Sequence, residues 1–320
     1  MQIKYEDIVD VTKIGTLGNK QDINKIIKII ECAKKEKKAL DKSDGKKVLL
    51  LCIDMQNDFM EDIGPMGVTG SKKDVENLTR WIYNNRARIS QIICSLDSHS
   101  PNQIFHASWW QDEEGIVPKP YTIITYEDVK NGKWKPANGE LDRSLEYLEN
   151  LEKQGNRELC IWPNHCIEGT EGADLETELT KMIYFQSMIN GVKPIFMHKG
   201  QDPYSEMYGI IKPEYDRNGY VNTELLKKIE EFDEVYIAGE ASSHCLLDSV
   251  VQILEHFGEG NEFTKRISVL EDCTSPIKGF EEITKTKFKE LEEKYGINII
   301  KSTDKTHNEA SSKICEGEGR

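Results

Sequence analysis

The sequence predicts an α/β protein whose core is a doubly wound, six-stranded parallel sheet in a three-layer α/β/α arrangement. Two observations support this fold class. Short, continuously apolar segments recur along the chain, and segments with apolar residues at helical spacing alternate with them. Continuous apolar strands are typical of a parallel sheet that helices cover on both faces, since each strand is then buried on both sides. Ligands of such sheets bind at the carboxyl ends of the strands, where polar residues should therefore gather.

The strands and helices are expected to alternate along the chain. The apolar runs have the length of strands, and the periodic segments are long enough for helices. The strands are predicted at residues 48–55, 89–97, 193–198, 234–239, 266–272 and 297–301. The helices are predicted at residues 75–85, 175–189, 223–232, 243–257 and 280–295.

Three parts of the chain depart from this alternation. Residues 1–46 are expected to form a helical extension, because residues 22–40 place isoleucines at helical spacing. Its helix would pack on the main domain or on a partner chain. Residues 111–157 are rich in proline, glycine and aromatic residues, and they are predicted to be an active-site insertion in the domain at residues 47–304. The polar residues 305–320 are expected to be a flexible tail.

The composition excludes several classes of function. Of the 320 residues, 38% are hydrophobic and 31% are charged, which is typical of a soluble globular protein. The formal net charge of −14 argues against broad binding to nucleic-acid phosphates or to anionic membranes. No stretch approaches the ~18 apolar residues of a membrane helix, and the N-terminus has no basic segment before an apolar one. We therefore expect a cytoplasmic protein without nucleic-acid or membrane partners.

The eight cysteines are scattered, and none forms a CxxC pair. In a reducing compartment most are expected to be small buried hydrophobic residues, so position decides which one could be a nucleophile. Cys245 falls in the first turn of a predicted helix, shortly after a predicted strand that ends at Gly239. Free N–H groups and the positive end of the helix dipole would stabilise a thiolate there and could bind an oxyanion. The alternative is a buried structural cysteine.

Two other strands end in residues that suit catalysis. Asp54 closes an otherwise apolar strand, where a charged side chain must be paired, hydrated or functional. The alternative is a cap on the following segment. Lys199 follows another apolar strand, where it could lie in a partly desolvated pocket. Its alternative is an exposed loop lysine.

A further strand ends in Asp97 and His99. These side chains share a face if the strand continues, because residues two apart point the same way. With a later histidine they form an oxygen-and-nitrogen ligand set that suits zinc, manganese or iron. The alternative is a polar turn with a surface histidine. Asp97 and His99 thus lie at the same edge of the predicted sheet as Asp54, Lys199 and Cys245, because all five follow or end strands at their carboxyl ends. This arrangement favours a single active site.

Five ordered blocks resemble the isochorismatase-like cysteine hydrolases, and within them the nicotinamidase and pyrazinamidase group. The blocks are IDMQNDF at 53–59, LDSH at 96–99, WPNHCIEGTEGA at 162–173, HKG at 198–200 and AGEASSHC at 238–245. The block at 162–173 is the most specific of them. Together with the order of the aspartate, lysine and cysteine, it makes the resemblance strong.

The resemblance implies the catalytic roles. Asp54 is the proton relay beside the thiol, and Cys245 is the nucleophile. Lys199 stabilises the thiolate and the developing negative charge. The peptide bond between Glu240 and Ala241 matches a position that is cis in the family. The N–H groups of Ala241 and Cys245 would then face the oxyanion.

The same resemblance implies a metal site and a substrate site. Asp97, His99 and His165 would ligate a divalent metal, with zinc expected first and manganese or iron as alternatives. Phe59 and Trp162 match the aromatic residues that flank the substrate ring.

Some features depart from the family pattern. Many relatives have a second histidine after the metal pair, and the nearest candidate here is His106, at a spacing one residue longer. The sequence leaves open whether His106 is a ligand or a histidine of a lid. Residues 111–157 have no counterpart in compact nicotinamidases, and the N-terminal extension also lies outside the resemblance.

The function that these observations predict is that of a metal-containing cysteine amidohydrolase. It would convert nicotinamide into nicotinate and ammonia through a thioester, a reaction of NAD salvage. One alternative is a related cysteine hydrolase that acts on another small amide or on a ureido compound, with the insertion reshaping the pocket. A second alternative is a non-enzymatic binding module. The expected partner is a small-molecule amide, and the sequence leaves open whether the chain forms a homo-oligomer.

Overall fold

The structure is a computed structural model that describes residues 3–18, 23–37, 45–154 and 157–304. Its centre is a sheet of six parallel strands in the spatial order β10–β9–β8–β1–β2–β7. The predicted fold class is therefore confirmed. The strands are β1 (Val48–Ile53), β2 (Ile89–Asp97), β7 (Ile195–Lys199), β8 (Glu234–Gly239), β9 (Ile267–Leu270) and β10 (Asn298–Ile300).

The strand order places a topological switch point between β1 and β8. From β1 the chain moves outward on one side to β2 and β7, and it then returns to β8 on the other side of β1. The crossovers on the two sides run in opposite directions, which leaves a crevice beyond the carboxyl ends of β1 and β8. The residues that follow these two strands are therefore the ones best placed to meet a ligand.

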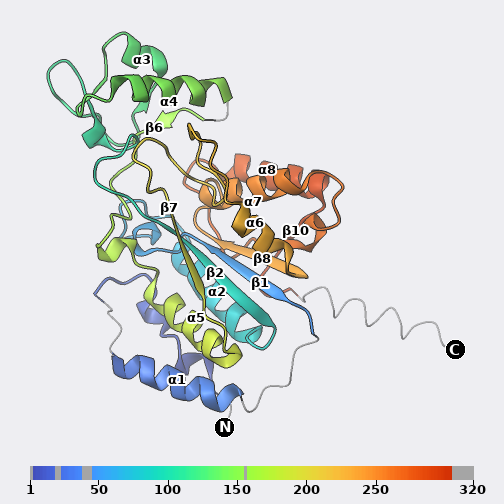
Figure 1. Ribbon diagram of the computed structural model, residues 1–320. Coiled ribbons are helices and arrows are strands. Elements are labelled where there is room, and N and C mark those ends of the chain that lie inside the picture. Colours follow the sequence, from blue (N-terminus) through green and yellow to red (C-terminus); the bar gives the residue numbers. More distant parts are fainter. Residues whose placement is uncertain (1–2, 19–22, 38–44, 155–156, 305–320) are drawn as a thin grey trace.

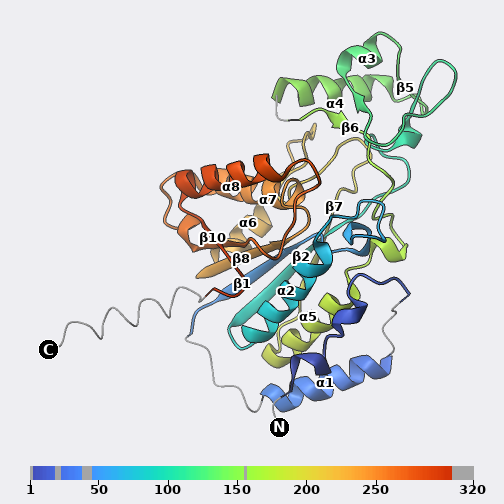
Figure 2. The same cartoon turned by 180° about the vertical axis from the view of Figure 1, so that it is seen from behind.

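Helices cover both faces of the sheet (Figures 1 and 2). One layer contains α1 (Ile23–Lys37), α2 (Ser71–Asn84) and α5 (Thr177–Asn190), and the other contains α6 (Thr223–Glu230), α7 (Cys245–Phe257) and α8 (Glu281–Tyr295). Alternate residues of β1 belong to two different apolar cores, with Leu49 in one and Leu50 in the other. This alternation explains why every residue of β1 is buried and why the strand is apolar throughout.

The N-terminal residues pack against the sheet domain. Helix α1 packs on α5, and Tyr5 and Ile8 are buried in the same core as α2. Of the two predicted positions for this helix, the one on the main domain is found. The predicted tail at residues 305–320 lies outside the described residues.

The described residues of the predicted insertion at 111–157, which are 111–154 and 157, form a lobe beside the sheet (Figure 1). The lobe contains α3 (Tyr126–Lys130) and α4 (Leu141–Gln154). Two short antiparallel strand pairs join segments of the chain in and next to the lobe. The pairs are β3 (Trp110–Gln111) with β5 (Lys135–Pro136), and β4 (Ile123–Ile124) with β6 (Leu159–Cys160). Tyr147 and Leu148 of α4 belong to the same apolar core as β1, so the lobe shares its core with the sheet.

Three element ends differ from the prediction at positions that matter for the site. Strand β1 ends at Ile53 and not at residue 55, so Asp54 follows the strand. Strand β7 continues to Lys199, so this lysine is the last residue of a strand and not part of a loop. Helix α7 begins at Cys245 and not at residue 243, because His244 has non-helical backbone angles. Within the described residues, no helix combines the length and the apolar character that a bilayer span requires.

We expect the central strand to dominate the stability of the fold. Leu50 is fully buried between the sheet and the α2 layer, so Leu50→Ala should leave a cavity and lower the free energy of unfolding by about 2–5 kcal/mol. Denaturant unfolding measures this loss. Ile283→Ala on the exposed face of α8 is the matched control, with an expected change within about 0.5 kcal/mol. Equal effects of the two substitutions would contradict the assigned core.

Candidate active site

Four segments bring polar side chains together at the switch point. Asp54 directly follows β1, Asp97 ends β2, Lys199 ends β7, and Cys245 begins α7 after β8. All four side chains are buried. The carboxyl ends of parallel strands meet at one edge of a sheet, so residues far apart in the sequence become neighbours here.

The backbone at the end of β1 has an unusual conformation. Asp54 has a φ angle of 46°, in the left-handed region, which aspartate tolerates better than most residues. Its N–H donates to the backbone oxygen of Ser95 at 3.3 Å, and the Ser95 hydroxyl donates to Asp54 Oδ1 at 2.6 Å. A Cβ on Gly239 would lie 2.0 Å from the oxygen of Ile53, so only glycine allows β8 to pass this close to β1.

Lys199 connects the other members of the site. Its Nζ donates to Asp97 Oδ1 at 2.5 Å and to the backbone oxygen of Met207 at 2.8 Å. The same Nζ lies 2.9 Å from Asp54 Oδ2 and 3.7 Å from Cys245 Sγ. An ammonium group without access to water is stable only if carboxylates surround it, and Lys199 has two.

The ionisation of these groups follows from burial and from that ammonium group. Burial raises the pKa of Asp54 to about 6, although the charge of Lys199 acts in the opposite direction. Burial would also raise the pKa of Asp97, but the Lys199 charge and His99 outweigh it and hold that pKa well below its usual range. The two carboxylates keep the pKa of Lys199 well above its ordinary value, against the effect of burial. The site therefore contains one carboxylate that can take up a proton near neutral pH, and another that stays ionised.

The expectation of a resting thiolate at Cys245 is wrong for this structure. Burial raises the pKa of the Cys245 thiol well above its ordinary value, the charge of Lys199 acts in the opposite direction, and the negative charges of Asp54, Asp97 and Glu206 act with burial. The prediction from the helix N-terminus did not include the three carboxylates or the loss of solvent. Cys245 is thus a thiol at rest, and it would become a thiolate only if a neighbouring base removed its proton.

Asp97, His99 and His165 form a group that could hold a metal ion, with one potential ligand atom from each within 4.8 Å of the others. Asp97 Oδ2 lies 3.6 Å from His99 Nε2 and 3.9 Å from His165 Nε2. The other ring nitrogen of each histidine is paired with a backbone oxygen. His99 Nδ1 lies 3.0 Å from the oxygen of Gly200, and His165 Nδ1 lies 2.8 Å from the oxygen of Pro163. Such bonds orient metal-binding histidines, and the buried His99 Nε2 has no hydrogen-bond partner among the described residues. The group therefore fits a divalent metal.

The backbone at Gly200 passes close to the His99 ring of the candidate metal group. A Cβ on Gly200 would lie 2.6 Å from Cε1 of the His99 ring, so the chain can pass behind the ring only with glycine at that position.

His106 lies beside the three-residue group. Its ring centroid is 5.8 Å from that of His99 and 6.1 Å from that of His165. Its Nδ1 is paired with the backbone oxygen of Ser100 at 3.1 Å, and its buried Nε2 has no hydrogen-bond partner in the described part of the chain. The ring is thus held like the other two, but its nitrogens lie outside the compact ligand group. Whether it ligates a metal stays open.

A small pocket opens onto Cys245, and it contains the other predicted residues. Phe59, Trp162 and Ala241 line it, together with Asp97 and His165 of the metal group. The Phe59 ring lies edge-on to the His165 ring at 5.6 Å. The pocket is therefore bounded by aromatic rings, the candidate metal ligands and the thiol.

Six lining residues were not predicted from the sequence. Three are aliphatic, namely Met66, Val68 and Ile277, and three carry polar groups, namely Glu206, Tyr208 and His244. The Trp162 Nε1–H donates to the Tyr208 hydroxyl at 2.9 Å, which fixes the indole. Burial raises the pKa of the Glu206 carboxyl to about 7. Glu206 and Tyr208 lie in the irregular segment between β7 and α6, where no sequence period marks them. Their acidic and aromatic character was the only available signal.

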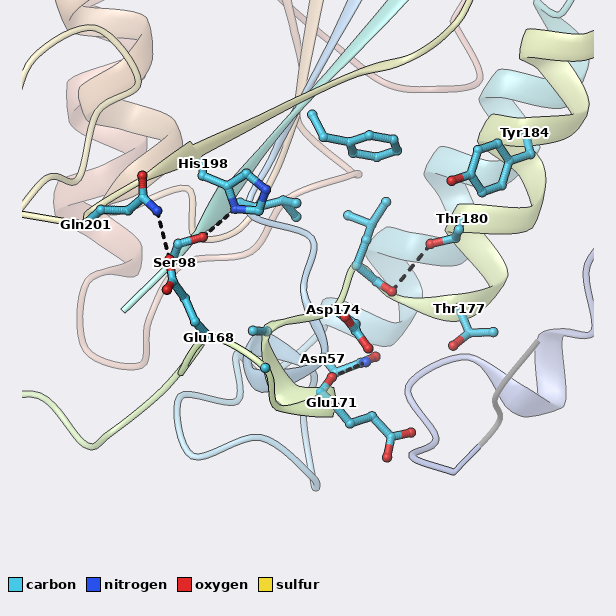
Figure 3. Close-up of a pocket in the computed structure, with 15 residues that line it drawn as sticks. Asn57, Ser98, Glu168, Glu171, Asp174, Thr177, Thr180, Tyr184, His198 and Gln201 are labelled. Carbon is cyan, nitrogen blue, oxygen red and sulfur yellow. Dashed lines mark hydrogen bonds between the residues drawn. The ribbon is translucent and has the colours of Figure 1, made fainter. Parts of the chain in front are cut away.

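A larger hollow of about 790 Å³ lies beside the edge strand β7 and α5 (Figure 3). Its polar lining includes Ser98, His198 and Tyr184, and the Ser98 hydroxyl is paired with His198 Nδ1 at 2.5 Å. Asp54, Asp97, Lys199 and Cys245 are all missing from its lining. The smaller pocket at Cys245 is therefore the candidate active site.

Sequence and structure comparisons agree with this geometry. The chain is 24% identical to the nicotinamidase of Saccharomyces cerevisiae over 253 residues, which cover 78% of this chain and 98% of that protein. It is 26% identical to the nicotinamidase of Escherichia coli over 208 residues, which cover 64% of this chain and 76% of that protein. A scan against models of protein families found no match.

Solved structures show the same fold. A nicotinamidase and pyrazinamidase of Acinetobacter baumanii superposes with a TM-score of 0.56 at 18% identity, over 82% of this chain and 99% of that one. The yeast nicotinamidase superposes with a TM-score of 0.55 at 22% identity, over 79% of this chain and 99% of that one. The chain therefore shares the α/β/α architecture of these solved enzymes. Both sequence relatives are nicotinamidases, so the chain is similar to the nicotinamidase and pyrazinamidase group in sequence as well as in fold.

We expect His165 to be required for metal binding. The wild-type chain should bind one divalent ion, and His165→Ala should weaken binding by more than the ~10–100-fold that the loss of an outer-shell partner causes. Titration of the purified protein against a competing chelator measures both affinities. His256→Ala changes an exposed histidine of α7 and should leave the affinity unaltered. Equal affinities for wild type and His165→Ala would exclude this ligand group.

Proposed function

We propose that the chain is an amidase that hydrolyses nicotinamide to nicotinate and ammonia, with Cys245 as the nucleophile. The observation that supports this most directly is the buried contact of Lys199 with Asp54, Asp97 and Cys245, of which Asp97 and Cys245 line an aromatic pocket. Both sequence relatives named above are nicotinamidases. The product is a precursor for NAD salvage.

The first chemical step follows from the ionisation of the site. Asp54 accepts the proton of the Cys245 thiol, and the sulfur attacks the carboxamide carbon. A carboxylate whose pKa is about 6 is mostly ionised at neutral pH, and it remains basic enough to take part in general base catalysis. Lys199, whose ammonium group lies 3.7 Å from the sulfur, offsets the negative charge that passes from Asp54 to the reacting atoms.

The tetrahedral oxyanion would be stabilised by the backbone N–H groups of Ala241 and Cys245. The Glu240–Ala241 peptide bond is cis, as the family pattern leads one to expect. Both residues line the pocket, and Cys245 is the first residue of α7, where the helix dipole favours negative charge. These donors require no reorganisation when charge develops.

The intermediate then breaks down in two steps. The C–N bond breaks, and Asp54 returns its proton to the leaving nitrogen, so that ammonia departs and a thioester remains on Cys245. Water attacks the thioester while Asp54 takes a proton from it. The C–S bond breaks, nicotinate is released, and the proton returns to the sulfur.

The aromatic walls and the candidate metal group would orient the substrate. Phe59 and Trp162 provide apolar faces for a pyridine ring. We propose zinc as the ion held by Asp97, His99 and His165, since two imidazoles and a carboxylate suit it, with manganese or iron as alternatives. When bound, such an ion supplies a Lewis acid that can take a pyridine-type nitrogen as a ligand.

A related hydrolase that acts on another small amide or a ureido compound is the second candidate. The observation that favours it is a contact between the predicted insertion and the pocket wall. Tyr121 places its ring edge-on to Trp162 at a centroid distance of 6.0 Å. A residue of this lobe therefore supports one wall of the pocket, and the lobe could set which substrates fit.

The proposed function predicts ammonia release from nicotinamide by the metal-loaded protein. Cys245→Ala should abolish this release because no other group provides the sulfur nucleophile, and it should retain the metal. A coupled ammonia assay measures turnover, and a panel of other small amides and ureido compounds tests the second candidate. Cys160→Ala, a cysteine outside the pocket lining, is the control and should stay active. Substantial turnover by Cys245→Ala would refute the mechanism.

The ionisation of Asp54 predicts the acid side of the pH profile. The base must be deprotonated, so kcat/KM should fall as the pH drops below about 6, by roughly tenfold per pH unit. Asp54→Asn should lower kcat by about 10²–10⁴-fold at neutral pH and remove this limb from any residual activity. Steady-state kinetics over a pH series checks both. An unchanged acid limb in the residual activity of Asp54→Asn would assign the limb to another group.

A further inference from the structure

Asp74 on α2 and Glu240 at the end of β8 are buried acids that the mechanism above does not use. Glu240 is 0% exposed and Asp74 is 5% exposed. The two side chains are within hydrogen-bonding reach of each other. Each also has one oxygen, Asp74 Oδ2 and Glu240 Oε1, without a hydrogen-bond partner among the described residues. Ionised carboxylates only accept hydrogen bonds, so a contact between them needs a proton that one of them donates.

The surroundings of this pair are acidic. The charged groups that act on it are Glu61, which faces both acids, and Asp272, which acts on Asp74. The remaining neighbour is Ser275, whose N–H donates to Glu240 Oε2 at a long 3.4 Å. Within the described residues, the charges that act most strongly on the pair are all negative, and two adjacent buried carboxyl groups in such surroundings cannot both ionise at low cost. Burial raises the pKa of Asp74 to about 6, and burial with the Asp74 charge raises that of Glu240 well above its ordinary value.

Glu240 is the first residue of the turn at residues 240–245, so the pair joins this turn to α2. The N–H of Glu240 donates to the oxygen of Ile53 at 2.8 Å, next to Asp54. The N–H of Ser242 donates to the oxygen of Ser275 at 2.9 Å, the residue that also contacts the Glu240 carboxyl group. The turn is thus fixed to the end of β1, to the loop after β9 and, through Glu240, to α2. It carries Ala241 and ends at Cys245, the two proposed oxyanion donors.

We propose that Asp74 and Glu240 share a proton and act as a positioning pair, which fixes the 240–245 turn and with it the N–H groups of Ala241 and Cys245. The catalytic part of this proposal rests on the proposed function, and the shared proton does not. Near neutral pH the single proton joins the two carboxyl groups. At alkaline pH its loss leaves two adjacent buried charges, whose repulsion separates α2 from the turn.

The sign of the pH effect follows from acids whose pKa values are raised by folding. Their contribution to stability is fully present below the ordinary carboxyl pKa of about 4 and is lost as the pH rises through the folded values. The loss begins above that ordinary pKa, is complete for Asp74 once the pH passes its folded pKa of about 6, and continues at higher pH until Glu240 has also ionised. The wild-type chain should therefore lose stability on the alkaline side through this pair.

The test replaces the shared proton with a permanent donor. In Glu240→Gln the amide nitrogen can donate to Asp74 at every pH, and in Asp74→Asn the new amide can donate to Glu240. For each variant, the Tm relative to wild type should increase by about 3 °C or more between about pH 7 and pH 9.5. The alkaline limb of kcat should move up by about one pH unit, with KM unchanged and with neutral-pH kcat within about twofold of wild type.

The matched control is Glu176→Gln. Glu176 is also a buried acid, with a pKa raised to about 7 by burial, but it accepts from the N–H groups of Leu179 and Gly15, away from the turn. Its amide variant should change the pH dependence of Tm and leave the alkaline limb of kcat in place.

The proposal of a shared proton would be refuted if the Tm difference between Glu240→Gln and wild type did not change with pH. A pH-dependent Tm difference without a shift of the kcat limb would overturn the positioning role. A wild-type chain that shows the Tm effect but turns over no nicotinamide would refute the proposed function while supporting the pair.

Discussion

The buried ammonium group of Lys199 is the interaction on which the rest of the site depends. It neutralises Asp54 and Asp97, which no other cation contacts this closely among the described residues, and it lies within reach of the Cys245 sulfur. Removing it would leave two uncompensated carboxylates in a water-free site, a change that costs about 3–5 kcal/mol in comparable buried pairs. Asp97 divides its two oxygens between the lysine and the histidines, so the ammonium group also links the proposed nucleophile to the candidate metal group.

The order of the strands explains how these side chains come together. The lysine, the two aspartates and the cysteine are separated by up to 191 positions between 54 and 245, yet they follow strands that lie next to each other in the order β8–β1–β2–β7. The switch point between β1 and β8 opens the crevice, and Gly239 allows the strands to approach there. Tyr121 of the lobe at residues 111–157 contacts the ring of Trp162. This contact connects the lobe to the pocket, although Tyr121 is not among the residues that contact Lys199.

The sequence allowed much of this fold to be predicted, because each buried parallel strand is an apolar run that ends in polar residues. Strands β2 and β8 have the predicted bounds, and the residues at the strand ends do meet at one edge of the sheet. Side-chain ionisation could not be predicted in the same way. The helix N-terminus suggested a thiolate at Cys245, but burial among three carboxylates favours the thiol. Glu206 and Tyr208 lie in a segment without periodicity, and the contact between Asp74 and Glu240 depends on how α2 packs against the end of β8.

The most direct test of the account is to trap the acyl group that the mechanism places on Cys245. Hydroxylamine competes with water for a thioester, so turnover of nicotinamide in its presence should yield nicotinohydroxamate at the expense of nicotinate. Liquid chromatography with mass spectrometry separates and quantifies the two products. The account predicts that the hydroxamate fraction rises with hydroxylamine concentration and that Cys245→Ala forms neither product. Steady release of nicotinate with no hydroxamate at any concentration would indicate direct attack by water and would contradict the central role of the cysteine.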